Sequence, residues 1–336
     1  MEKNYAVWFK APNTVEYTEL PIVKPKDGEI LMKSHRSLIS NGTETSILSS
    51  ESKGSFWEGY KVHFPFTPGY SSVSTIIEAG KGVDKSWVGK KVACHSCHSS
   101  YNTRDIISAR PNLIRDGVSD DNAVFSILSK ISLQGVRRAR LKLGESVVVY
   151  GLGPIGNMAL QFARLSGATP IIAVDTSDFR LSFVPDAPDI IKVNPLKQNV
   201  KEVVEKATKG RMADVVFEVT GVASLIPKEF EALHNQGRFI VLSSPRGKTE
   251  IDFHDLCNRP SFEIIGAHQE SQPAFETLDN PWTHERNIEL FLDLVAAGKI
   301  DAAKLISHRA KYTEAGKIYE MLLKNPSGAL GVVFEW

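Results

Sequence analysis

Three glycines near the middle of the chain have the spacing G-x-G-x-x-G. They follow the apolar, β-branched run 147–149 and precede a helical pattern. In a strand–turn–helix of this kind, the first glycine permits a tight turn, the second lets the backbone approach a pyrophosphate, and the third lets the helix pack on the strand. The amide groups at the start of the helix then point at the anion. We therefore predict that this turn binds a dinucleotide through Gly151, Gly153, Pro154, Ile155 and Gly156.

An acidic residue after the next strand indicates which dinucleotide is bound. A second apolar run ends at Asp175, about 20 residues beyond the last glycine, where a carboxylate accepts hydrogen bonds from a ribose. A carboxylate there repels a 2′-phosphate, so the sequence favours NAD over NADP. Arg180 is the opposing signal, because a nearby arginine can bind that phosphate. Further cofactor contacts are expected from three hydroxyl residues near the ends of later strands, Thr220, Ser243 and Ser244.

The composition of the 336 residues fits a globular protein of two domains, with 42% apolar and 24% charged residues. The net charge is +1 and no basic run stands out, so neither nucleic acid nor a membrane is expected as a partner. The N-terminus has no signal-like apolar stretch and no segment approaches the length of a membrane span, so we expect a cytoplasmic protein. Three cysteines are too few for a disulfide framework.

Two kinds of hydrophobic pattern divide the chain. The first part contains short strands, such as 29–34, separated by clusters of glycine and proline. Strands then alternate with helices, which is typical of a parallel, doubly wound sheet. The last apolar run, 330–334, is predicted to be a strand that rejoins the first domain. We expect an α/β protein with a β-rich catalytic domain, 1–121 and 270–336, and a nucleotide-binding domain, 122–269.

This layout resembles the medium-chain dehydrogenase/reductase superfamily, which includes zinc alcohol and polyol dehydrogenases and quinone reductases. The resemblance covers nearly the whole chain, and its most specific parts are the segments 144–156 and 213–221 and the turn 88–92. It implies a GroES-like catalytic domain interrupted by a Rossmann domain, with the active site between them. It also implies a dimer or tetramer, and we expect a homodimer.

The sequence departs from this family at the residues that would hold a catalytic zinc ion. In place of Cys-x-Ser/Thr-Asp the chain has the segment 40–44, so that Asn41 stands where the cysteine ligand would be. Tyr70 replaces the histidine of Gly-His-Glu, and the third ligand would fall near Ile127. An amide, a phenol and an alkyl group are not normal zinc ligands. The four-cysteine structural lobe is also missing, so we predict no metal site.

A second cluster, at positions 94–98, has the pattern C-x-x-C-H of covalent haem attachment. In a cytoplasmic protein without an export signal this match is a coincidence. The two cysteines and two histidines could also bind one zinc ion, but their spacing along a strand places them on both faces. In one interpretation these are strand and loop residues without a chemical role. In the other, His98 or Tyr101 lines the cleft, where a histidine is suited to proton transfer.

Lys130 interrupts the apolar pattern of a helix predicted over 123–141. By the resemblance, this helix passes close to the nicotinamide, where a lysine could polarise a carbonyl oxygen or change its own pKa by desolvation. Alternatively, the lysine lies on the polar face of the helix in water. The sequence leaves both possibilities open.

Together, the resemblance and the altered ligand positions predict a zinc-independent, NAD-dependent oxidoreductase that interconverts a secondary alcohol and a ketone. The cofactor carries the hydride, so a side chain must handle the proton. Tyr70 is the first candidate, because it occupies the vacated ligand position and because a phenol near a cation has a lowered pKa. Thr43 matches the hydroxyl that relays protons in the family. The candidate partners of these two residues are Glu44, Lys130 and His98.

The polar replacements around these positions favour a polyhydroxylated substrate such as a sugar or cyclitol. The same motifs resemble those of bacteriochlorophyllide dehydrogenase-type enzymes and of sugar or secondary-metabolite dehydrogenases. A quinone or enoyl reductase is the second hypothesis, because zinc-free reductases of the superfamily also carry asparagine near the lost cysteine, although they usually use NADPH. The third hypothesis is a catalytically inactive NAD-binding protein.

Overall fold

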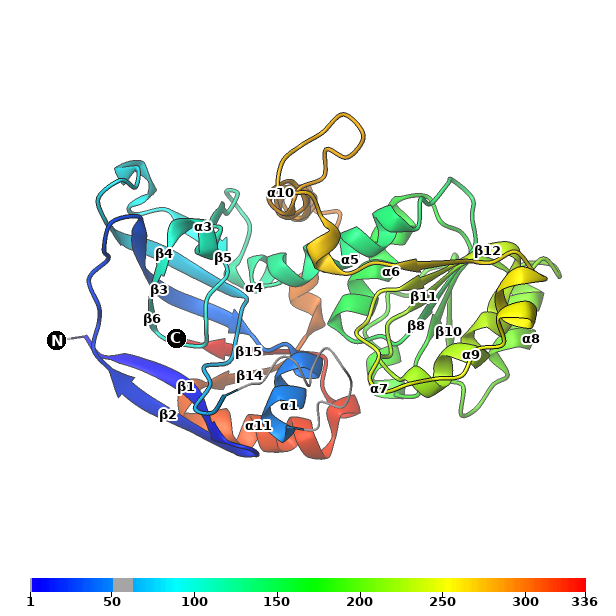
Figure 1. Cartoon of the computed structure of the whole chain (residues 1–336), viewed down its shortest axis with the longest axis horizontal. Coiled ribbons are helices and arrows are strands. Elements are labelled where there is room, and N and C mark those ends of the chain that lie inside the picture. The colour runs from blue at the N-terminus through cyan, green and yellow to red at the C-terminus, as the bar shows by residue number, and fades with distance from the viewer. Residues whose placement is uncertain (1, 51–62) are drawn as a thin grey trace. The chain divides into compact units, whose positions relative to one another are not determined.

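The computed structural model describes residues 2–50 and 63–336, and the chain divides into two compact units (Figure 1). Unit 1 comprises Met1–Leu128 and His284–Trp336, and unit 2 comprises Ser129–Thr283. The two points at which the chain passes from one unit to the other both lie later in the chain than the domain boundaries expected from the sequence. Helix α5 (Ser126–Arg138) continues unbroken through the first of these points. The predicted α/β architecture, with one GroES-like unit and one Rossmann unit, is confirmed.

Unit 1 is built on a mainly antiparallel sheet with the strand order β14-β15-β3-β4-β5-β7, and β6 also pairs with β3. The strands are β3 (Glu29–Leu38), β4 (Ser72–Ala79), β5 (Lys91–Cys94), β6 (Tyr101–Asp105), β7 (Asn112–Leu113), β14 (Ile306–Lys311) and β15 (Gly331–Glu335). A separate hairpin is formed by β1 (Asn4–Ala11) and β2 (Thr14–Leu20). The C-terminal strand β15 pairs with β3, which confirms that the tail rejoins the first domain.

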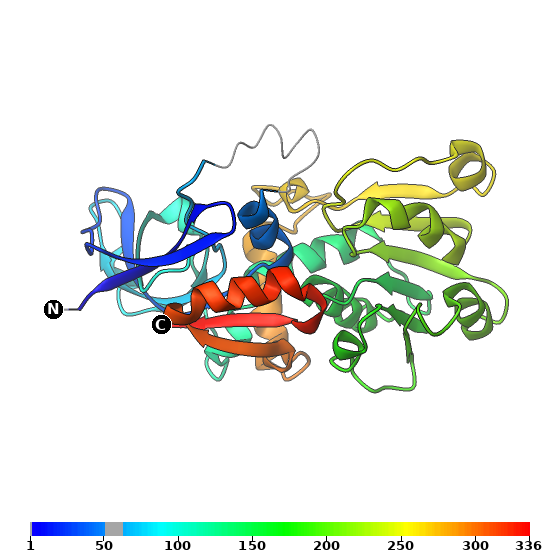
Figure 2. The same cartoon turned by 90° about the horizontal axis from the view of Figure 1, so that it is seen from below.

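Among its described residues, unit 1 has the helices α1 (Asn41–Ser49), α3 (Ile106–Ala109), α4 (Asp120–Ala123), α10 (His284–Ala296) and α11 (Ala315–Lys324). The C-terminal helix α11 lies beside β15 (Figure 2), and both contribute to one apolar core with α1 and β1. Phe9, Leu48, Tyr319 and Phe334 are fully buried in this core. It therefore joins the two ends of the chain to the segment that follows β3.

Unit 2 contains a six-stranded parallel sheet with the order β10-β9-β8-β11-β12-β13. In chain order this is 3-2-1-4-5-6, the arrangement of dinucleotide-binding folds. Its strands are β8 (Val147–Tyr150), β9 (Ile171–Val174), β10 (Ile190–Val193), β11 (Ala213–Glu218), β12 (Leu233–Val241) and β13 (Glu263–Gly266). The predicted doubly wound sheet is confirmed. The valines of β8 are fully buried, because helices cover a parallel sheet on both faces.

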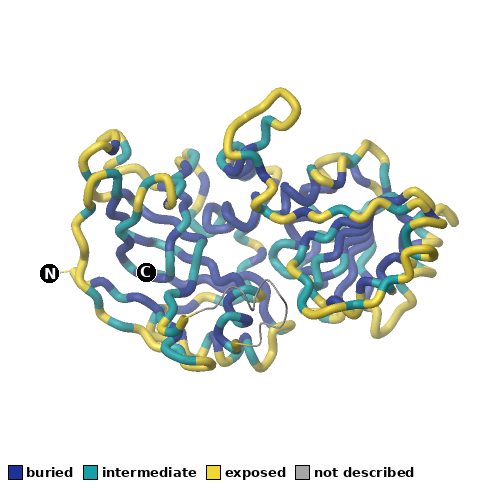
Figure 3. The backbone as a smooth tube through the Cα atoms, in the orientation of Figure 1, coloured by how far each residue is buried: buried dark blue, intermediate teal, exposed yellow. Residues whose placement is uncertain are grey.

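The helices of unit 2 besides α5 are α6 (Pro154–Leu165), α7 (Asp178–Leu181), α8 (Val200–Ala207) and α9 (Ile226–Glu229). Figure 3 shows that the central strands of both sheets are largely buried, whereas most connecting segments are exposed. The edge strands β13 and β14 are mostly exposed or half-buried. In the part of the chain that the structure describes, no helix combines the length and the apolar character that a membrane crossing needs.

Candidate functional site

The three glycines of the turn in unit 2 differ in what surrounds them. Gly151 has a φ of +89°, and a Cβ there would lie 2.7 Å from the backbone carbonyl of Val219. A Cβ on Gly156 would lie 1.9 Å from the carbonyl oxygen of Gly151, so only glycine lets α6 pack on the turn. A Cβ on Gly153 would meet no atom within 4 Å, which leaves open space over this backbone. These are the differences that a pyrophosphate cradle requires.

The start of α6 offers donors to an anion in that space. Gly153 is its N-cap residue and Pro154 its first residue, and no side chain caps the helix. Amide groups in the first turn of such a helix have no partner within the helix and carry partial positive charge. The turn is itself held by Asn157, whose Nδ2 donates to the Leu152 carbonyl at 3.1 Å. The residues present therefore fit a dinucleotide phosphate.

Asp175 ties the end of β9 to this turn. Its Oδ2 accepts from the amide of Leu152 and its Oδ1 accepts from the amide of Ser177, both at 2.8 Å. A guanidinium nitrogen of Arg180 lies 3.9 Å from Oδ2. Burial lowers the pKa of Arg180, although the charge of Asp175 acts in the opposite direction. An acceptor for ribose hydroxyls and a cation for a phosphate therefore stand side by side.

Glu218 at the end of β11 was missed by the sequence reasoning. It is fully buried, and its Oε1 accepts from the amide and the hydroxyl of Thr220, both at 2.7 Å. Its Oε2 accepts from the Ser243 hydroxyl. Glu218 thus fixes Thr220 and Ser243, two residues that the sequence predicted to contact the cofactor, at the ends of neighbouring strands. Ser244, the third predicted residue, is exposed. An acidic residue that ends a buried strand was the available signal.

In unit 1, three hydroxyl groups meet at the start of α1. The Tyr70 hydroxyl donates to Ser40 Oγ at 2.5 Å and is also hydrogen-bonded to Thr43. Ser40 is the N-cap residue of α1, but its hydroxyl accepts no helix amide and is left for Tyr70. Tyr70 and Thr43 are partly exposed, so this cluster (Ser40, Thr43 and Tyr70) reaches the surface of the unit.

The surroundings of Tyr70 raise its pKa to about 12. Burial of the phenol is the largest cause, and the negative charge of Glu44 adds to it, whereas the hydrogen bonds with Ser40 and Thr43 act in the opposite direction. The expectation that a cation lowers this pKa is therefore wrong, because the charged group beside Tyr70 is a carboxylate. At neutral pH Tyr70 carries its proton and is a donor.

Glu44 and His98 lie behind the hydroxyl cluster, in the interior of unit 1. Glu44 Oε1 accepts from the amide of Ser40 at 2.8 Å, and Oε2 lies 3.0 Å from His98 Nε2. The Tyr319 hydroxyl also donates to Oε2, and His98 Nδ1 lies 2.8 Å from Ser37 Oγ. Glu44 is 1% exposed and His98 0%. The interpretation that His98 lines a cleft is therefore wrong, because the ring packs in the core.

Cys94 of the C-x-x-C-H segment and the nearby Tyr101 both pack inside unit 1. Cys94 is buried, with its sulfur 3.2 Å from Ser72 Oγ, and burial raises the pKa of this thiol. Tyr101, the other residue proposed for the cleft, is buried in β6 and donates its hydroxyl to Glu2. These surroundings favour the interpretation of strand and loop residues.

The residues at the family's zinc-ligand positions do not fit a zinc ion. Asn41 donates its Nδ2 to the Leu330 carbonyl at 2.8 Å, and Ile127 is apolar and fully buried. Asn41 Oδ1 is buried with no hydrogen-bond partner among the described residues, but one amide oxygen is not a zinc site. Within residues 2–50 and 63–336, no three His, Cys, Asp or Glu side chains converge on one point.

Lys130 is buried in α5, with 2% of its surface exposed. The alternative in which it faces water is therefore wrong. It belongs to unit 2, where α5 contacts the glycine turn directly: Ser132 Oγ donates to the Ile155 carbonyl at 2.9 Å.

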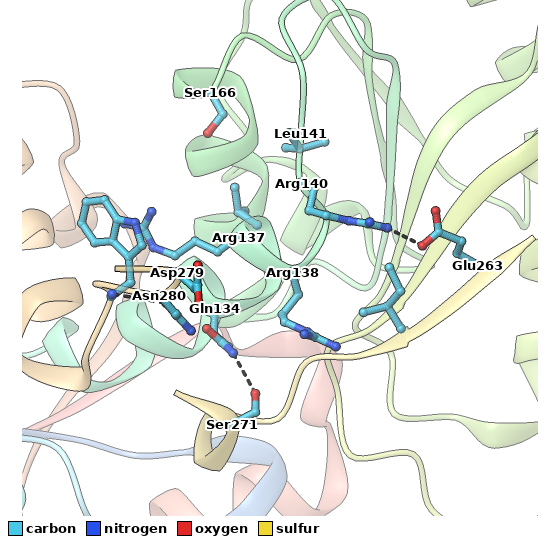
Figure 4. A pocket seen from close by; sticks show the side chains of 13 residues that line it. Gln134, Arg137, Arg138, Arg140, Leu141, Ser166, Glu263, Ser271, Asp279 and Asn280 are labelled. Atoms are coloured by element: carbon cyan, nitrogen blue, oxygen red, sulfur yellow. Dashed lines mark hydrogen bonds and ion pairs between the residues drawn. The ribbon is translucent and has the colours of Figure 1, made fainter. Parts of the chain in front are cut away.

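A pocket of about 660 Å³ opens in unit 2 beside β13 and the last turn of α5 (Figure 4). None of the predicted site residues lines it. Arg137 stacks on Trp282 with 3.2 Å between the guanidinium carbon and the ring centroid, and Arg140 pairs with Glu263. Arg138 donates to a backbone carbonyl at 3.3 Å. Because each of these arginines already has a partner, we do not assign an anionic substrate to this pocket.

The chain is similar in sequence to known dehydrogenases. The family described as zinc-binding dehydrogenase matches residues 154–281, and the alcohol dehydrogenase GroES-like domain matches residues 26–118. The 2-dehydro-3-deoxy-L-galactonate 5-dehydrogenase of Pseudoalteromonas atlantica is 25% identical over 81% of this chain and 84% of its own length. The L-threonine 3-dehydrogenase of Pyrococcus abyssi is 24% identical over 93% of both chains.

Solved structures show the same fold. Galactitol-1-phosphate dehydrogenase from Escherichia coli has a TM-score of 0.84 and 16% identity, with 99% of this chain and 100% of that chain covered. A putative zinc-binding dehydrogenase from Sinorhizobium meliloti, bound to NADP, has a TM-score of 0.81 and 21% identity, with both chains covered completely.

Proposed function

Because the chain belongs to the medium-chain dehydrogenase/reductase superfamily, we propose that it interconverts a secondary alcohol and a ketone on a polyhydroxylated small molecule. The cofactor in this proposal is NAD, and no catalytic zinc ion takes part. The observation that carries the proposal is the hydrogen-bonded cluster of Ser40, Thr43 and Tyr70. By the sequence resemblance, its members lie in the segments that supply zinc ligands in zinc-type members of the family.

The cofactor would be held by groups of unit 2. Its pyrophosphate would lie over Gly153, against the first turn of α6, and its ribose hydroxyls would face Asp175. When bound, a nicotinamide cofactor supplies or accepts the hydride, while the protein provides orientation and proton handling. Asp175 supports NAD, whereas Arg180 would suit the phosphate of NADP.

Tyr70 is the group proposed to handle the proton. Its phenol is protonated at neutral pH and donates a proton to the ketone oxygen as that oxygen gains charge. The hydroxyls of Ser40 and Thr43 then return a proton to Tyr70, with Thr43 partly exposed to water. In alcohol oxidation the proton moves the other way. General acid–base help of this kind is worth roughly a hundred- to ten-thousand-fold in rate.

The substrate class follows from the polar lining and is supported by the relatives' names. Those names specify a sugar acid, threonine and a sugar-alcohol phosphate, each of which has polar groups beside the reacting carbon. Hydroxyl donors in a site discriminate strongly against analogues that lack the matching hydroxyl. We therefore expect turnover of vicinal polyols or hydroxy acids and little turnover of simple aliphatic alcohols.

A substrate screen with metal analysis tests this proposal. Purified protein is mixed with NAD⁺ and with sorbitol, galactitol, myo-inositol, L-threonine, galactonate or 2-butanol, and NADH is followed by absorbance. We expect the protein to contain less than one zinc ion per chain and to turn over a polyol or a hydroxy acid. This turnover should persist when a chelator is added. One tightly held zinc ion per chain, whose removal abolishes turnover, would contradict the metal-free mechanism.

The same screen separates the alternatives. Turnover of quinones or enones with NADPH, and of no alcohol, would support the reductase hypothesis, which Arg180 beside the ribose position favours. Calorimetric binding of NAD⁺ without turnover in any panel would support an inactive NAD-binding protein. The chain's three cysteines are free thiols, which fits the proposed cytoplasmic location.

The proposal includes a homodimer. Strand β13 is an edge of the unit 2 sheet, its residues are mostly exposed, and Ile264 is 39% exposed. An open edge strand can pair with a second copy of itself about a two-fold axis. Light scattering behind a sizing column should give twice the mass of the 37.1 kDa chain. Ile264→Lys should shift the population to monomer, and a wild-type monomer would contradict the proposal.

A further inference from the structure

A buried carboxylate in unit 1 receives donors from three parts of the chain that are far apart in sequence. Glu44 Oε1 accepts from the Ser40 amide at 2.8 Å. Glu44 Oε2 lies 3.0 Å from His98 Nε2 and accepts from the Tyr319 hydroxyl. A carboxylate that is 1% exposed is costly unless hydrogen bonds replace its water, so each donor matters to its position.

His98 is fixed by its neighbours. Gly69 has a φ of +97°, and a Cβ there would lie 2.7 Å from the His98 amide nitrogen and 2.8 Å from its ring. The His98 amide donates to the Pro68 carbonyl at 2.9 Å, and Nδ1 lies 2.8 Å from Ser37 Oγ. Ser37 also accepts from the indole of Trp336 at 2.8 Å. The imidazole therefore has little freedom to turn away from Glu44.

Tyr319 is fixed by apolar contacts and donates its hydroxyl to Glu44. Its ring meets Phe9 edge to face, with 4.9 Å between centroids and 89° between planes. Phe334 lies on another side, with 6.3 Å between centroids. Burial and the charge of Glu44 raise the pKa of Tyr319 well above its ordinary value, so the hydroxyl keeps its proton. It is therefore a donor to the carboxylate at neutral pH.

We infer that Tyr319 is a positioning residue for the proposed reaction. Its hydroxyl orients Glu44, Glu44 holds the backbone of Ser40, and Ser40 Oγ receives the hydroxyl of Tyr70. This inference rests on the proposed role of Tyr70. It assigns to the C-terminal helix α11 a part in the chemistry of a site formed around α1.

Tyr319→Phe tests the first link without any ligand, because it removes one oxygen and keeps the ring between Phe9 and Phe334. Loss of a hydrogen bond to a buried charge should raise the hydrogen-exchange rate of the Ser40 amide by about tenfold. The matched control is Tyr312→Phe, whose ring stacks on Tyr5 and Trp336 in the same unit. It should leave that rate unchanged. Unchanged exchange in Tyr319→Phe would overturn the inference.

A double-mutant cycle tests the link to catalysis, with the alcohol that NAD⁺ oxidises fastest in the screen. Tyr319→Phe should lower kcat by about tenfold with little change in KM, and should add no further loss to Tyr70→Phe, because the group it positions is then absent. Equal fold losses in both backgrounds would mean a merely structural role and would overturn the inference.

The variants also separate failure of this inference from failure of the proposed function. An unchanged kcat in folded Tyr70→Phe would contradict the proposed role of Tyr70. It would also contradict the inference about Tyr319, whatever effect Tyr319→Phe has on hydrogen exchange of the Ser40 amide. Loss of activity in Tyr70→Phe together with full activity in Tyr319→Phe leaves the proposed function standing and removes Tyr319 alone.

Discussion

The glycine turn of unit 2 and the hydroxyl cluster of unit 1 are built in different ways. The turn is made by the backbone of one short segment, 151–156, and its key property is the absence of side chains. The cluster and its support need side chains from β3, α1, the segments before β4 and β6, and α11. A site made from local backbone is visible in sequence spacing, whereas a site made from distant side chains depends on packing.

The largest effect is expected in the turn itself, at Gly156. Gly156→Ala places a Cβ 1.9 Å from a carbonyl oxygen, so the strand–turn–helix must shift and unit 2 should lose stability. Thermal unfolding should show a large fall in Tm. Gly153→Ala is the matched control, because its Cβ meets no protein atom; it should keep the Tm and weaken NADH binding by at least about tenfold. Equal Tm values for both variants would contradict this assignment, in which Gly156 is needed for helix packing and Gly153 for close approach of the cofactor.

Tyr70→Phe tests the other region. The variant keeps the ring and removes the proposed proton donor, so kcat should fall by roughly a hundredfold or more. NADH affinity, measured by fluorescence titration, should not change, because the cofactor is proposed to bind groups of unit 2. Retention of kcat in a folded variant would contradict the role assigned to Tyr70.

Asp175→Asn should change cofactor choice more than rate. The amide keeps one acceptor for the Leu152 amide but removes the charge that repels a 2′-phosphate, with Arg180 still 3.9 Å from that position. We expect the ratio of kcat/KM for NAD to that for NADP to fall by about tenfold, which corresponds to about 1.4 kcal/mol. Arg180→Gln should move the ratio in the opposite direction. An unchanged ratio in both variants would remove these residues from cofactor selection.

The smallest effect is expected from pH. The raised pKa of about 12 means that Tyr70 is protonated in folded protein at neutral and moderately alkaline pH. Ketone reduction, which needs the protonated phenol, should therefore be nearly constant over this range, whereas alcohol oxidation should rise with pH because it releases a proton. A fall in the reduction rate near pH 7, absent from Tyr70→Phe, would show that the phenol titrates there and would contradict the raised pKa.

Much of the fold could be predicted from local patterns of apolar residues in the sequence. Buried strands such as β8 and the strand–helix alternation predicted the parallel sheet, and the final strand was placed correctly in unit 1. The errors concern burial and electrostatics. One of two interpretations placed His98 at a cleft, whereas it is buried in unit 1, and Tyr70 was expected to have a lowered pKa. Both depend on which groups surround a side chain, and residue spacing carries no such information.

The amino-acid sequence by itself determined the glycine turn, because its three glycines act through backbone geometry within one strand–turn–helix unit. The acidic residue at a set interval beyond them, Asp175, follows the next strand, β9, and its carboxylate accepts from the Leu152 amide of the turn. Only the tertiary structure decided that Tyr319 lies against Glu44, since these residues are separated by 275 positions and meet because α11 packs beside α1. Tertiary packing also decided the sign of the pKa shift of Tyr70, because desolvation and the charge of Glu44 act through space.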